Sequence, residues 1–429
     1  AGILANSSDS RELNELERLA IKSFDMVVVN VCPFEKISFE SADADEVLSK
    51  IDIAGVAILR AGAKNYKNVT VIVDKVDYYV ALNANDFGRL KLAVKAFNFT
   101  ANYDRLICSK LAEQTGEKPF KTFNFEKLKD MKYGENPHQK GAIYKTDRMV
   151  DYEIVNGKEL TFNDILNVTE ATNLISEFYD VNCVSIIRHT KPCGVALGRS
   201  LYEAYTKAFD CDPVSSFYGT VGFSKTVDEE VAKHLNSMAV EVVVAPDYDE
   251  KALELFSDNS EIKLVKLNTP LKDYRRLTVE EVILTPFGAL VQDRNNSELD
   301  KDMFKVVTRE KPTAEQIEDA IFAWKVVKHA KTNSVVIARD FKSVAIAQGQ
   351  TNALSAVEWA LNYACDGSKE AVLASDSFLP AEDCIYSAIQ GRISLIIQPG
   401  GAIKDQKLIE VCDKYGIAMI TTGIRNYRQ

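Results

Sequence analysis

The sequence predicts an α/β protein with more than one domain, and three observations predict it. The chain has 429 residues, of which 46% are hydrophobic and 27% are charged, a composition typical of a globular protein that buries sizeable cores. Short runs rich in valine and isoleucine alternate with segments whose apolar residues recur at helical spacing. The same alternation is repeated in the second part of the chain.

The first part of the chain predicts alternating helices and strands. We expect a helix over 10–24, a strand over 25–31, a helical stretch over 45–63 interrupted at Gly55, a strand over 68–74, and two helices over 83–114 that break near Asn98. The next stretch, 115–132, is charged, contains glycine and proline, and loses the helical period. Such a stretch indicates a domain boundary, which we expect near residue 125.

The second part predicts two related α/β regions. The first has a helix over 171–179, a strand over 183–188 leading into a Pro-Cys-Gly turn, and a strand over 240–246. The second has a helix over 314–330 and strands over 334–339, 371–375 and 394–398. We therefore expect one domain over 1–124 and another over 125–429, with subdomains at about 133–265 and 312–429 joined by the irregular stretch 265–312.

Charge and cysteine content narrow the function. The chain has 52 basic and 62 acidic side chains and a net charge of −10, which opposes non-specific binding to nucleic acid or anionic lipid. Its eight cysteines occur singly, without a C-x-x-C pair, which favours a reducing compartment and no zinc ribbon. The sequence shows neither an apolar run long enough to cross a bilayer nor a signal peptide. We expect a cytoplasmic protein without a nucleic-acid or membrane partner.

The strongest candidate for chemistry is His189, which directly follows a predicted buried strand in the run RHTKPCG. A strand end that carries a cation and an imidazole into a turn is a common way to hold an acid–base group. The alternative is a turn histidine with a satisfied hydrogen bond. Pro192-Cys193 matches half of a zinc deaminase signature, but position 196 is alanine and no H-x-E motif precedes it, so we expect no metal.

Four other polar segments are candidates for binding, each with a structural alternative. The run from Lys132 to Gln139 is either a phosphate clamp or a linker turn. The Gly-Gly turn in 398–405 and the run around Arg425 are either anion sites or an ordinary turn and a solvated tail. Asp52 and Lys64 lie at opposite ends of an apolar segment, where ion-pair decoration of a surface helix is the alternative.

Taken together, these motifs resemble the bifunctional AICAR transformylase/IMP cyclohydrolase family of purine biosynthesis. The resemblance runs from the first residue to the last and is carried, in order, by AGILA, VVVNVCPF, KIDIAGVAILRAGAKNY, KAFNFTANYD, KYGENPHQKGAIY, RHTKPCGVA, DPVSSF, EVVVAPDYDEKALELF, KTNSVVIA, ASDSFLP, IIQPGGAIKD and TTGIRNYRQ.

The resemblance implies a fold and two reactions. It implies a methylglyoxal-synthase-like N-terminal domain, incomplete in this chain, and two cytidine-deaminase-like subdomains without zinc. It implies formyl transfer from 10-formyltetrahydrofolate to the 5-amino group of AICAR, giving FAICAR, and then dehydrative closure of FAICAR to IMP. No metal takes part in that chemistry. The resemblance also implies a homodimer whose subunits share the transformylase sites.

The resemblance also implies site residues. For the transformylase, His189 accepts the proton of the attacking amine, Arg188 stands beside it, and Asn333 orients the substrate amide. The expected substrate and folate contacts are Lys132, Tyr133, Gly219, Gln350, Asp383 and Arg425. For the cyclohydrolase, Lys64 stabilises the developing oxyanion, and the nucleotide is lined by Asp52, Asn65 and Asn30.

The chain departs from the family at several of these places. The family usually has lysine where this chain has Arg188, and a guanidinium stabilises charge but is a poor proton donor. Other departures are Ala353 for arginine, Tyr218 for glycine, Cys32 for tyrosine, and Ala381-Glu382 before Asp383. The family's opening phosphate loop is absent before Ala1, so we expect the transformylase to be better preserved than the cyclohydrolase. A non-catalytic, nucleotide-binding subunit is the alternative hypothesis, and a zinc deaminase is a third.

Overall fold

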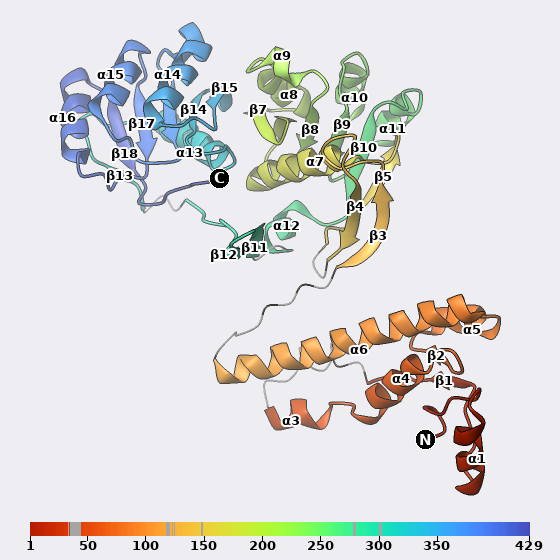
Figure 1. The fold of residues 1–429 in the computed structure, drawn as a ribbon. Coiled ribbons are helices and arrows are strands. Elements are labelled where there is room, and N and C mark those ends of the chain that lie inside the picture. Colours follow the sequence, from red (N-terminus) through yellow and green to blue (C-terminus); the bar gives the residue numbers. More distant parts are fainter. Residues whose placement is uncertain are drawn as a thin grey trace. The chain divides into compact units, whose positions relative to one another are not determined.

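The computed structural model describes residues 1–32, 34, 44–116, 121, 123, 125–146, 149–277, 280–299 and 303–429. The chain divides into two compact units, Ala1–Phe125 and Glu126–Gln429. None of the helices in these described ranges combines the length and the apolar character that crossing a membrane requires. Figure 1 shows the helices and strands of each unit.

Unit 1 is a small α/β layer. Its elements are α1 (Ser10–Arg18), β1 (Met26–Val28), α3 (Ala44–Ser49), α4 (Ala54–Lys64), β2 (Thr70–Ile72), η1 (Lys75–Asp77), α5 (Tyr78–Leu82) and α6 (Asp86–Thr115). Strands β1 and β2 pair in parallel, with Val27 opposite Val71. Helices α4 and α6 cover this pair, because Leu59 and Ala63 on α4 and Leu92 on α6 turn inward to one apolar cluster.

Two predictions for unit 1 were wrong. Helix α6 runs without a break through Asn98, because Asn98 faces solvent while Ala96 and Thr100 on either side of it are buried. An exposed asparagine inside a helix costs only about 0.7 kcal/mol. The interruption of the 45–63 stretch falls at residues 50–53 and not at Gly55, which lies in the first turn of α4.

Unit 2 contains the remaining elements. In its first half these are β3 (Glu126–Met131), β4 (Gly141–Lys145), β5 (Tyr152–Asn156), α7 (Phe162–Ile175), η2 (Ser176–Phe178), β6 (Cys183–Arg188), β7 (Lys191–Leu197), α8 (Leu201–Phe209), α9 (Pro213–Ser216), β8 (Thr220–Phe223), α10 (Glu229–Asn236), β9 (Val242–Ala245), α11 (Glu250–Ser257) and β10 (Lys263–Leu267). Then follow α12 (Leu271–Leu277), β11 (Glu280–Thr285), β12 (Gly288–Asp293) and β13 (Lys305–Val306). The second half has α13 (Ala314–Val327), β14 (Val335–Arg339), β15 (Lys342–Ala347), α14 (Ala353–Ala364), η4 (Cys365–Ser368), β16 (Val372–Ser375), α15 (Glu382–Gln390), β17 (Leu395–Gln398), α16 (Asp405–Tyr415) and β18 (Ala418–Thr421).

One mixed sheet runs through unit 2, and over the described residues it has twelve strands in the order β13-β18-β17-β16-β14-β15-β7-β6-β8-β9-β10-β5. Each half repeats the same connectivity. In the first half β6 pairs antiparallel with β7 and β8, and β8, β9 and β10 follow in parallel. In the second half β14, β15, β16, β17 and β18 pair in the same way. The halves meet where β15 and β7 pair antiparallel, with Lys342 opposite Ala196.

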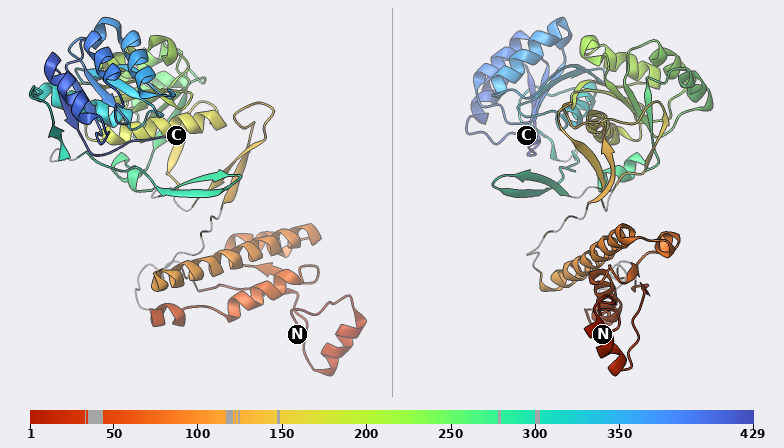
Figure 2. Two further views of the ribbon diagram at one scale, coloured as in Figure 1. Left: turned by 60° about the vertical axis from the view of Figure 1, so that its left-hand side comes forward. Right: turned by 45° about the vertical axis from the view of Figure 1, so that its right-hand side comes forward.

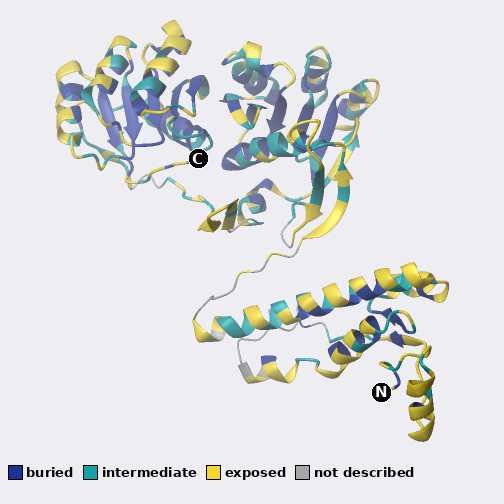
Figure 3. Cartoon of the chain, viewed as in Figure 1, coloured by how far each residue is buried: buried dark blue, intermediate teal, exposed yellow. Residues whose placement is uncertain are grey.

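The sheet is the buried layer of unit 2. Its inner strands are dark in Figure 3, and both faces are covered by apolar clusters formed with the helices. A strand buried on both faces reads as a continuous apolar run, and for this reason the sequence predicted β6, β14 and β17 with little error. Helix α7 begins nine residues before the predicted helix because Thr161 and Asp164 form a capping box.

Three predictions for unit 2 were wrong. The stretch 115–132 is not irregular to its end, because β3 starts at Glu126 and pairs with β4. The stretch 265–312 holds α12 and the β11–β12 hairpin. Pro192, Cys193 and Gly194 form no turn but belong to β7. Both hairpins, β3–β4 and β11–β12, extend away from the body of unit 2 (Figure 2).

Candidate functional site

The turn that carries His189 is a two-residue hairpin loop between β6 and β7. Arg188 and Lys191 are register partners across it, and the loop consists of His189 and Thr190 alone. Both loop residues have positive φ, at 50° and 62°. Two positive φ values are what a tight hairpin needs to match the twist of its strands, and this conformation is unfavourable for residues other than glycine.

Two hydrogen bonds stabilise this hairpin. Thr190 N–H donates to the side-chain oxygen of Asn167 on α7 at 2.8 Å. The guanidinium of Arg188 donates through Nη1 to the carbonyl of Tyr218, which itself has a φ of 55°. Arg188 thereby fixes the loop before β8, where Gly219 is needed because an added Cβ would lie 3.0 Å from Ser216 O and 3.3 Å from a methyl of Ile186. The His189 side chain is left exposed at the tip of the loop.

A hollow of about 350 Å³ lies beside this turn and takes its walls from both halves of the sheet. The first half contributes Arg188, His189, Lys191, Pro192, Cys193, Cys211, Asp212 and Ser215, and the second half contributes Ile346, Gln348, Gln350, Trp359 and Tyr363. The reason is topological: β7 and β15 run antiparallel, so the beginning of β7 lies next to the end of β15.

Asn333 reaches this hollow through Gln350. Its side-chain N–H donates to Gln350 O at 3.0 Å, and the two backbones exchange further bonds at 3.0 and 3.2 Å. The structure thus brings together four of the residues expected in one site, Arg188, His189, Asn333 and Gln350, although more than 140 positions separate the first two from the last two in the sequence.

A buried carboxylate stabilises the segment that carries Asn333 by hydrogen bonds to the residues on either side of it. Asp376 is fully buried and accepts from Thr332 Oγ1 at 2.6 Å and from Ser334 N–H at 3.0 Å. Burial raises the pKa of Asp376, while these hydrogen bonds lower it in part. Arg428 adds a second support, because its N–H donates to Thr332 Oγ1 at 2.8 Å and its guanidinium pairs with Glu170 at 2.5 Å.

Several residues of the hollow were missed by sequence reasoning. Gln348 donates to Pro192 O at 2.8 Å, and its own side-chain oxygen is buried without a hydrogen-bond partner among the described residues. Trp359 and Tyr363 stack with ring centroids 5.0 Å apart and an interplanar angle of 6°. Their i, i+4 spacing on one helix was the available signal. The hollow therefore offers an aromatic wall and an acceptor as well as an imidazole.

The thiols and the phenol of the hollow stay protonated. Burial raises the pKa of Cys193 to about 12 and that of Cys211 to about 12. Burial and the neighbouring carboxylate of Asp212 also raise the pKa of Tyr363. A thiol in this state is a poor nucleophile, which leaves the imidazole of His189 as the better proton acceptor in the hollow.

The other predicted residues of unit 2 do not line this hollow. Lys132 and Tyr133 lie in the β3–β4 loop, with Lys132 Nζ 5.9 Å from the centre of the Tyr133 ring. Asp383 is exposed in the first turn of α15. Arg425 is exposed with its guanidinium 4.1 Å from the centre of the Tyr427 ring. Ala353 is buried in the first turn of α14. Their roles in binding stay predictions.

In unit 1 the four predicted residues separate into two pairs. Asn30 follows β1, and Asp52 precedes α4, where its Oδ1 accepts from Gly55 N–H at 2.7 Å. Lys64 and Asn65 end α4, and the Asn65 amide donates to Ile3 O at 2.9 Å and Ala5 O at 2.8 Å. Because α4 connects parallel strands, its two ends lie at opposite edges of the sheet. The described residues of unit 1 thus place Asn30 and Asp52 at the carboxyl edge, away from Lys64 and Asn65.

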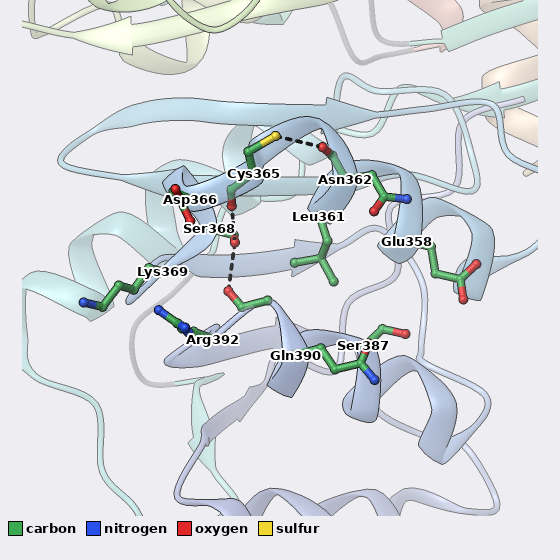
Figure 4. A pocket seen from close by; sticks show the side chains of 11 residues that line it. Glu358, Leu361, Asn362, Cys365, Asp366, Ser368, Lys369, Ser387, Gln390 and Arg392 are labelled. Carbon is green, nitrogen blue, oxygen red and sulfur yellow. Dashed lines mark hydrogen bonds between the residues drawn. The ribbon is translucent and has the colours of Figure 1, made fainter.

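A second hollow of about 470 Å³ lies between α14 and α15 (Figure 4). None of the predicted site residues lines it. Both helices end there, at the C-caps Cys365 and Gly391, and Lys369 and Arg392 are the cations expected to offset the partial negative charge of two helix C-termini. This hollow is explained by helix capping, and the one around His189 is the better candidate. Over the described residues, no three His, Cys, Asp or Glu side chains gather as a metal site would require.

Comparisons with known proteins agree with the motifs. A family model described as AICARFT/IMPCHase bienzyme matches residues 62–363. The bifunctional purine biosynthesis protein PurH of Acetivibrio thermocellus is 41% identical over 444 residues, covering 100% of this chain and 86% of that protein. PurH of Caldicellulosiruptor saccharolyticus is 41% identical over 446 residues, and PurH of Petrotoga mobilis 39% over 447, both covering this whole chain and 86% and 85% of the relative.

One solved structure, of a protein called ForH, is 28% identical over 26% of this chain and 62% of that chain, with a TM-score of 0.23.

Proposed function

This chain belongs to the AICARFT/IMPCHase bienzyme family, and on that premise we propose that it transfers a formyl group in the hollow around His189. The chain is an enzyme of purine biosynthesis with AICAR formyltransferase as its activity. The co-substrate is 10-formyltetrahydrofolate, the acceptor is the 5-amino group of AICAR, and the product FAICAR is closed to IMP by the family's second activity.

The observation that carries this proposal is the convergence of Arg188 and His189 from one half of the sheet with Asn333 and Gln350 from the other. His189 accepts the proton that the attacking amine loses, which is the role of a general base within reach of the reacting nitrogen. The amide of Asn333 and the free side-chain oxygen of Gln348 are groups of the kind that orient a carboxamide. Trp359 offers a flat face to a planar heterocycle.

Lys132, Tyr133, Gly219, Asp383 and Arg425 complete the substrate and folate contacts in this proposal. Unit 1 is the cyclohydrolase domain of methylglyoxal-synthase type in this proposal. Its expected nucleotide contacts, Asn30 and Asp52 near the start of α4 and Lys64 and Asn65 at its end, then have to reach the nucleotide from two separate places. The two repeated halves of unit 2 are its cytidine-deaminase-like subdomains, and their matching strand pairings support this. All eight cysteines are free, which supports a place in the reducing cytoplasm.

The enzyme works as a homodimer in this proposal. The β11–β12 hairpin supports it, because none of the buried apolar clusters among the described residues includes its strands. Leu284 of β11 is 79% exposed and Phe287 of its turn is 102% exposed. Apolar side chains so fully exposed are typical of surfaces that a partner covers, and a second copy is the partner that we propose. Light scattering would show a dimer for the intact chain and a monomer for Phe287→Asp/Leu290→Asp.

The test of the function is direct. Purified protein is mixed with 10-formyltetrahydrofolate and AICAR, and tetrahydrofolate, FAICAR and IMP are followed. We expect formation of tetrahydrofolate and FAICAR. Folded dimer that binds nucleotide in a calorimeter but releases no tetrahydrofolate would instead identify a non-catalytic homologue. FAICAR that accumulates without IMP would mean that unit 1 of this chain lacks the cyclohydrolase.

A further inference from the structure

The guanidinium of Arg188 is engaged in a structural hydrogen bond. Its Nη1 donates to Tyr218 O, in the loop that leads to the next strand. The second half of the sheet has the same arrangement, since Arg339 Nη1 donates to Lys369 O at 2.7 Å before β16. Because an arginine makes the same hydrogen bond in both halves, we infer that this bond stabilises the fold. A guanidinium also does not release a proton under ordinary conditions.

Lys191 stands directly across the turn from Arg188. The two are register partners on β6 and β7, and cross-strand partners project from the same face with Cβ atoms about 4.5–5.5 Å apart. Both line the same hollow, together with His189. The Lys191 side chain is exposed, and an ammonium carries three protons on a flexible stem.

We propose that Lys191 is the cation that gives its proton to the leaving group in the formyl-transfer site. It lies across the turn from Arg188, whose guanidinium does not release a proton. This inference rests on the proposed function. Charged and titratable groups that line the hollow with Lys191 come from three elements: Arg188, His189 and Cys193 on the hairpin, Cys211 and Asp212 after α8, and Tyr363 on α14. Of the cations in this set, the lysine is the one that readily gives up a proton and remains stable as a neutral amine.

The proton transfers balance. The 5-amino nitrogen of AICAR attacks the formyl carbon, a nitrogen–carbon bond forms, and His189 accepts the proton that the amine loses. The bond between the formyl carbon and N10 of the folate then breaks, and its electron pair stays on N10. Lys191 gives its proton to N10, so tetrahydrofolate leaves neutral at that atom. The lysine amine and the imidazolium then exchange one proton through water, which restores the starting state.

The experiment separates charge from proton donation. Lys191→Arg keeps the charge and removes the donor, so we expect kcat to fall about 100-fold with KM changed less than about threefold. The swap Arg188→Lys/Lys191→Arg returns an ammonium to the pair and should recover at least about tenfold of that loss. The alkaline limb of the kcat profile, which reports loss of the donor's proton, should be absent in Lys191→Arg and present again in the swap.

The matched control is Lys342→Arg. Lys342 holds the same position in the second hairpin, opposite Arg339, and does not line the hollow, so kcat and its pH profile should be unchanged. Thermal unfolding of Lys191→Gln and of the wild type tests whether a change at this position alters the stability of the fold. If Lys191→Arg keeps kcat within twofold while wild-type protein turns over, the role of Lys191 is overturned. Absence of turnover in the wild type would instead overturn the proposed function.

Discussion

The two halves of the sheet contain the same hairpin, and the hollow with His189 lies beside the first of them. The first turn joins β6 and β7 and reads Arg188-His189-Thr190-Lys191, and the second joins β14 and β15 and reads Arg339-Asp340-Phe341-Lys342. All four central residues have positive φ, between 50° and 62°. Each hairpin also has an irregularity in register just before its turn. The backbone conformation of the turn is therefore common to both halves, and the imidazole occurs only in the first turn.

The two turns are held with different strength. Asn167 and Asp319 each lie six residues after the cap of the preceding helix, Thr161 or Thr313. Asn167 accepts one turn N–H, at 2.8 Å, whereas the Asp319 carboxylate accepts two, from Asp340 at 2.9 Å and Phe341 at 2.8 Å. The second turn is tied at both of its residues. The first leaves His189 N–H without this support, so the backbone of the proposed proton acceptor is less restrained than that of Asp340.

The asparagine of the site also has a counterpart. Asn182 donates to Arg199 O at 2.9 Å, just as Asn333 donates to Gln350 O at 3.0 Å. This bond closes the start of one strand onto the end of its neighbour in both halves. Its presence in both halves indicates a structural role, so the proposed role of Asn333 in the site depends on its surroundings.

The largest effect is expected at the central residue in which the turns differ most. His189→Ala should lower kcat for formyl transfer about 10²- to 10⁴-fold, because it removes the proton acceptor. Asp340→Ala, at the equivalent position, should leave kcat within twofold. Steady-state kinetics of both variants check this. Equal losses in the two variants would mean that the turns act only through the fold.

Glu177 and His329 test the contact between the halves. They hold equivalent positions, sixteen residues after Thr161 and Thr313, and meet at 3.1 Å with Lys328 Nζ 2.9 Å from the same carboxylate oxygen. Burial would raise the pKa of Glu177, but the bond with His329 and the charges of Lys328 and Arg275 outweigh it and lower the pKa to about 2. Glu177→Gln leaves Lys328 poorly compensated and should cost about 3–5 kcal/mol in the free energy of unfolding at pH 7.

The pH dependence of this effect has a defined sign. Because the folded pKa is depressed below its ordinary value of 4.5, the stabilisation is present above about pH 4.5 and is lost as pH falls towards 2. Urea unfolding of wild type and Glu177→Gln should therefore show a difference that narrows between pH 5 and pH 3. A difference that is constant with pH would contradict the charge argument.

A glycine distinguishes the two hairpins in their packing. Gly194 and Ala345 are equivalent, opposite Ile186 and Ile337, but a Cβ on Gly194 would lie 2.0 Å from Ala208 O of α8. Gly194→Ala should therefore destabilise unit 2 by about 1–3 kcal/mol, since the backbone of α8 has to shift. Ala345→Gly is the matched change and should cost about 1 kcal/mol. Thermal unfolding of both variants measures the contrast.

The smallest expected effect concerns the residues that hold the turns. Asp319→Ala leaves two N–H groups without their acceptor and should cost about 2 kcal/mol, and Asn167→Ala leaves one and should cost about 1 kcal/mol. Asn167→Ala should also raise KM or lower kcat, because it frees the turn with His189, whereas Asp319→Ala should not. Denaturant unfolding and steady-state kinetics of both variants would show that the larger loss of stability and the kinetic loss occur in different variants. Equal kinetic losses would mean that rigidity of the turn is irrelevant to the site.

Local sequence determined the elements whose neighbours are all apolar. Strands β6 and β14 were predicted within a residue, because a strand buried on both faces has to be apolar throughout. Prediction from local sequence failed where pairing with a strand remote in sequence determines the secondary structure. Residues 126–131 are mostly charged and form a strand because β4 pairs with them. Pro192 is in a strand because the chain already turns at His189 and Thr190.

The sequence by itself determined the family, the repeated α/β pattern and the histidine, because these depend on residue types in a fixed order along the chain. Only the tertiary structure decided that Gln350, to which Asn333 is bonded, lines one hollow with His189, since the antiparallel meeting of β7 and β15 brings residues from the two halves to one edge. It also decided that the turn with His189 borders a hollow. The physical reason is that a site is a set of distances between residues remote in sequence, and strand pairing sets those distances.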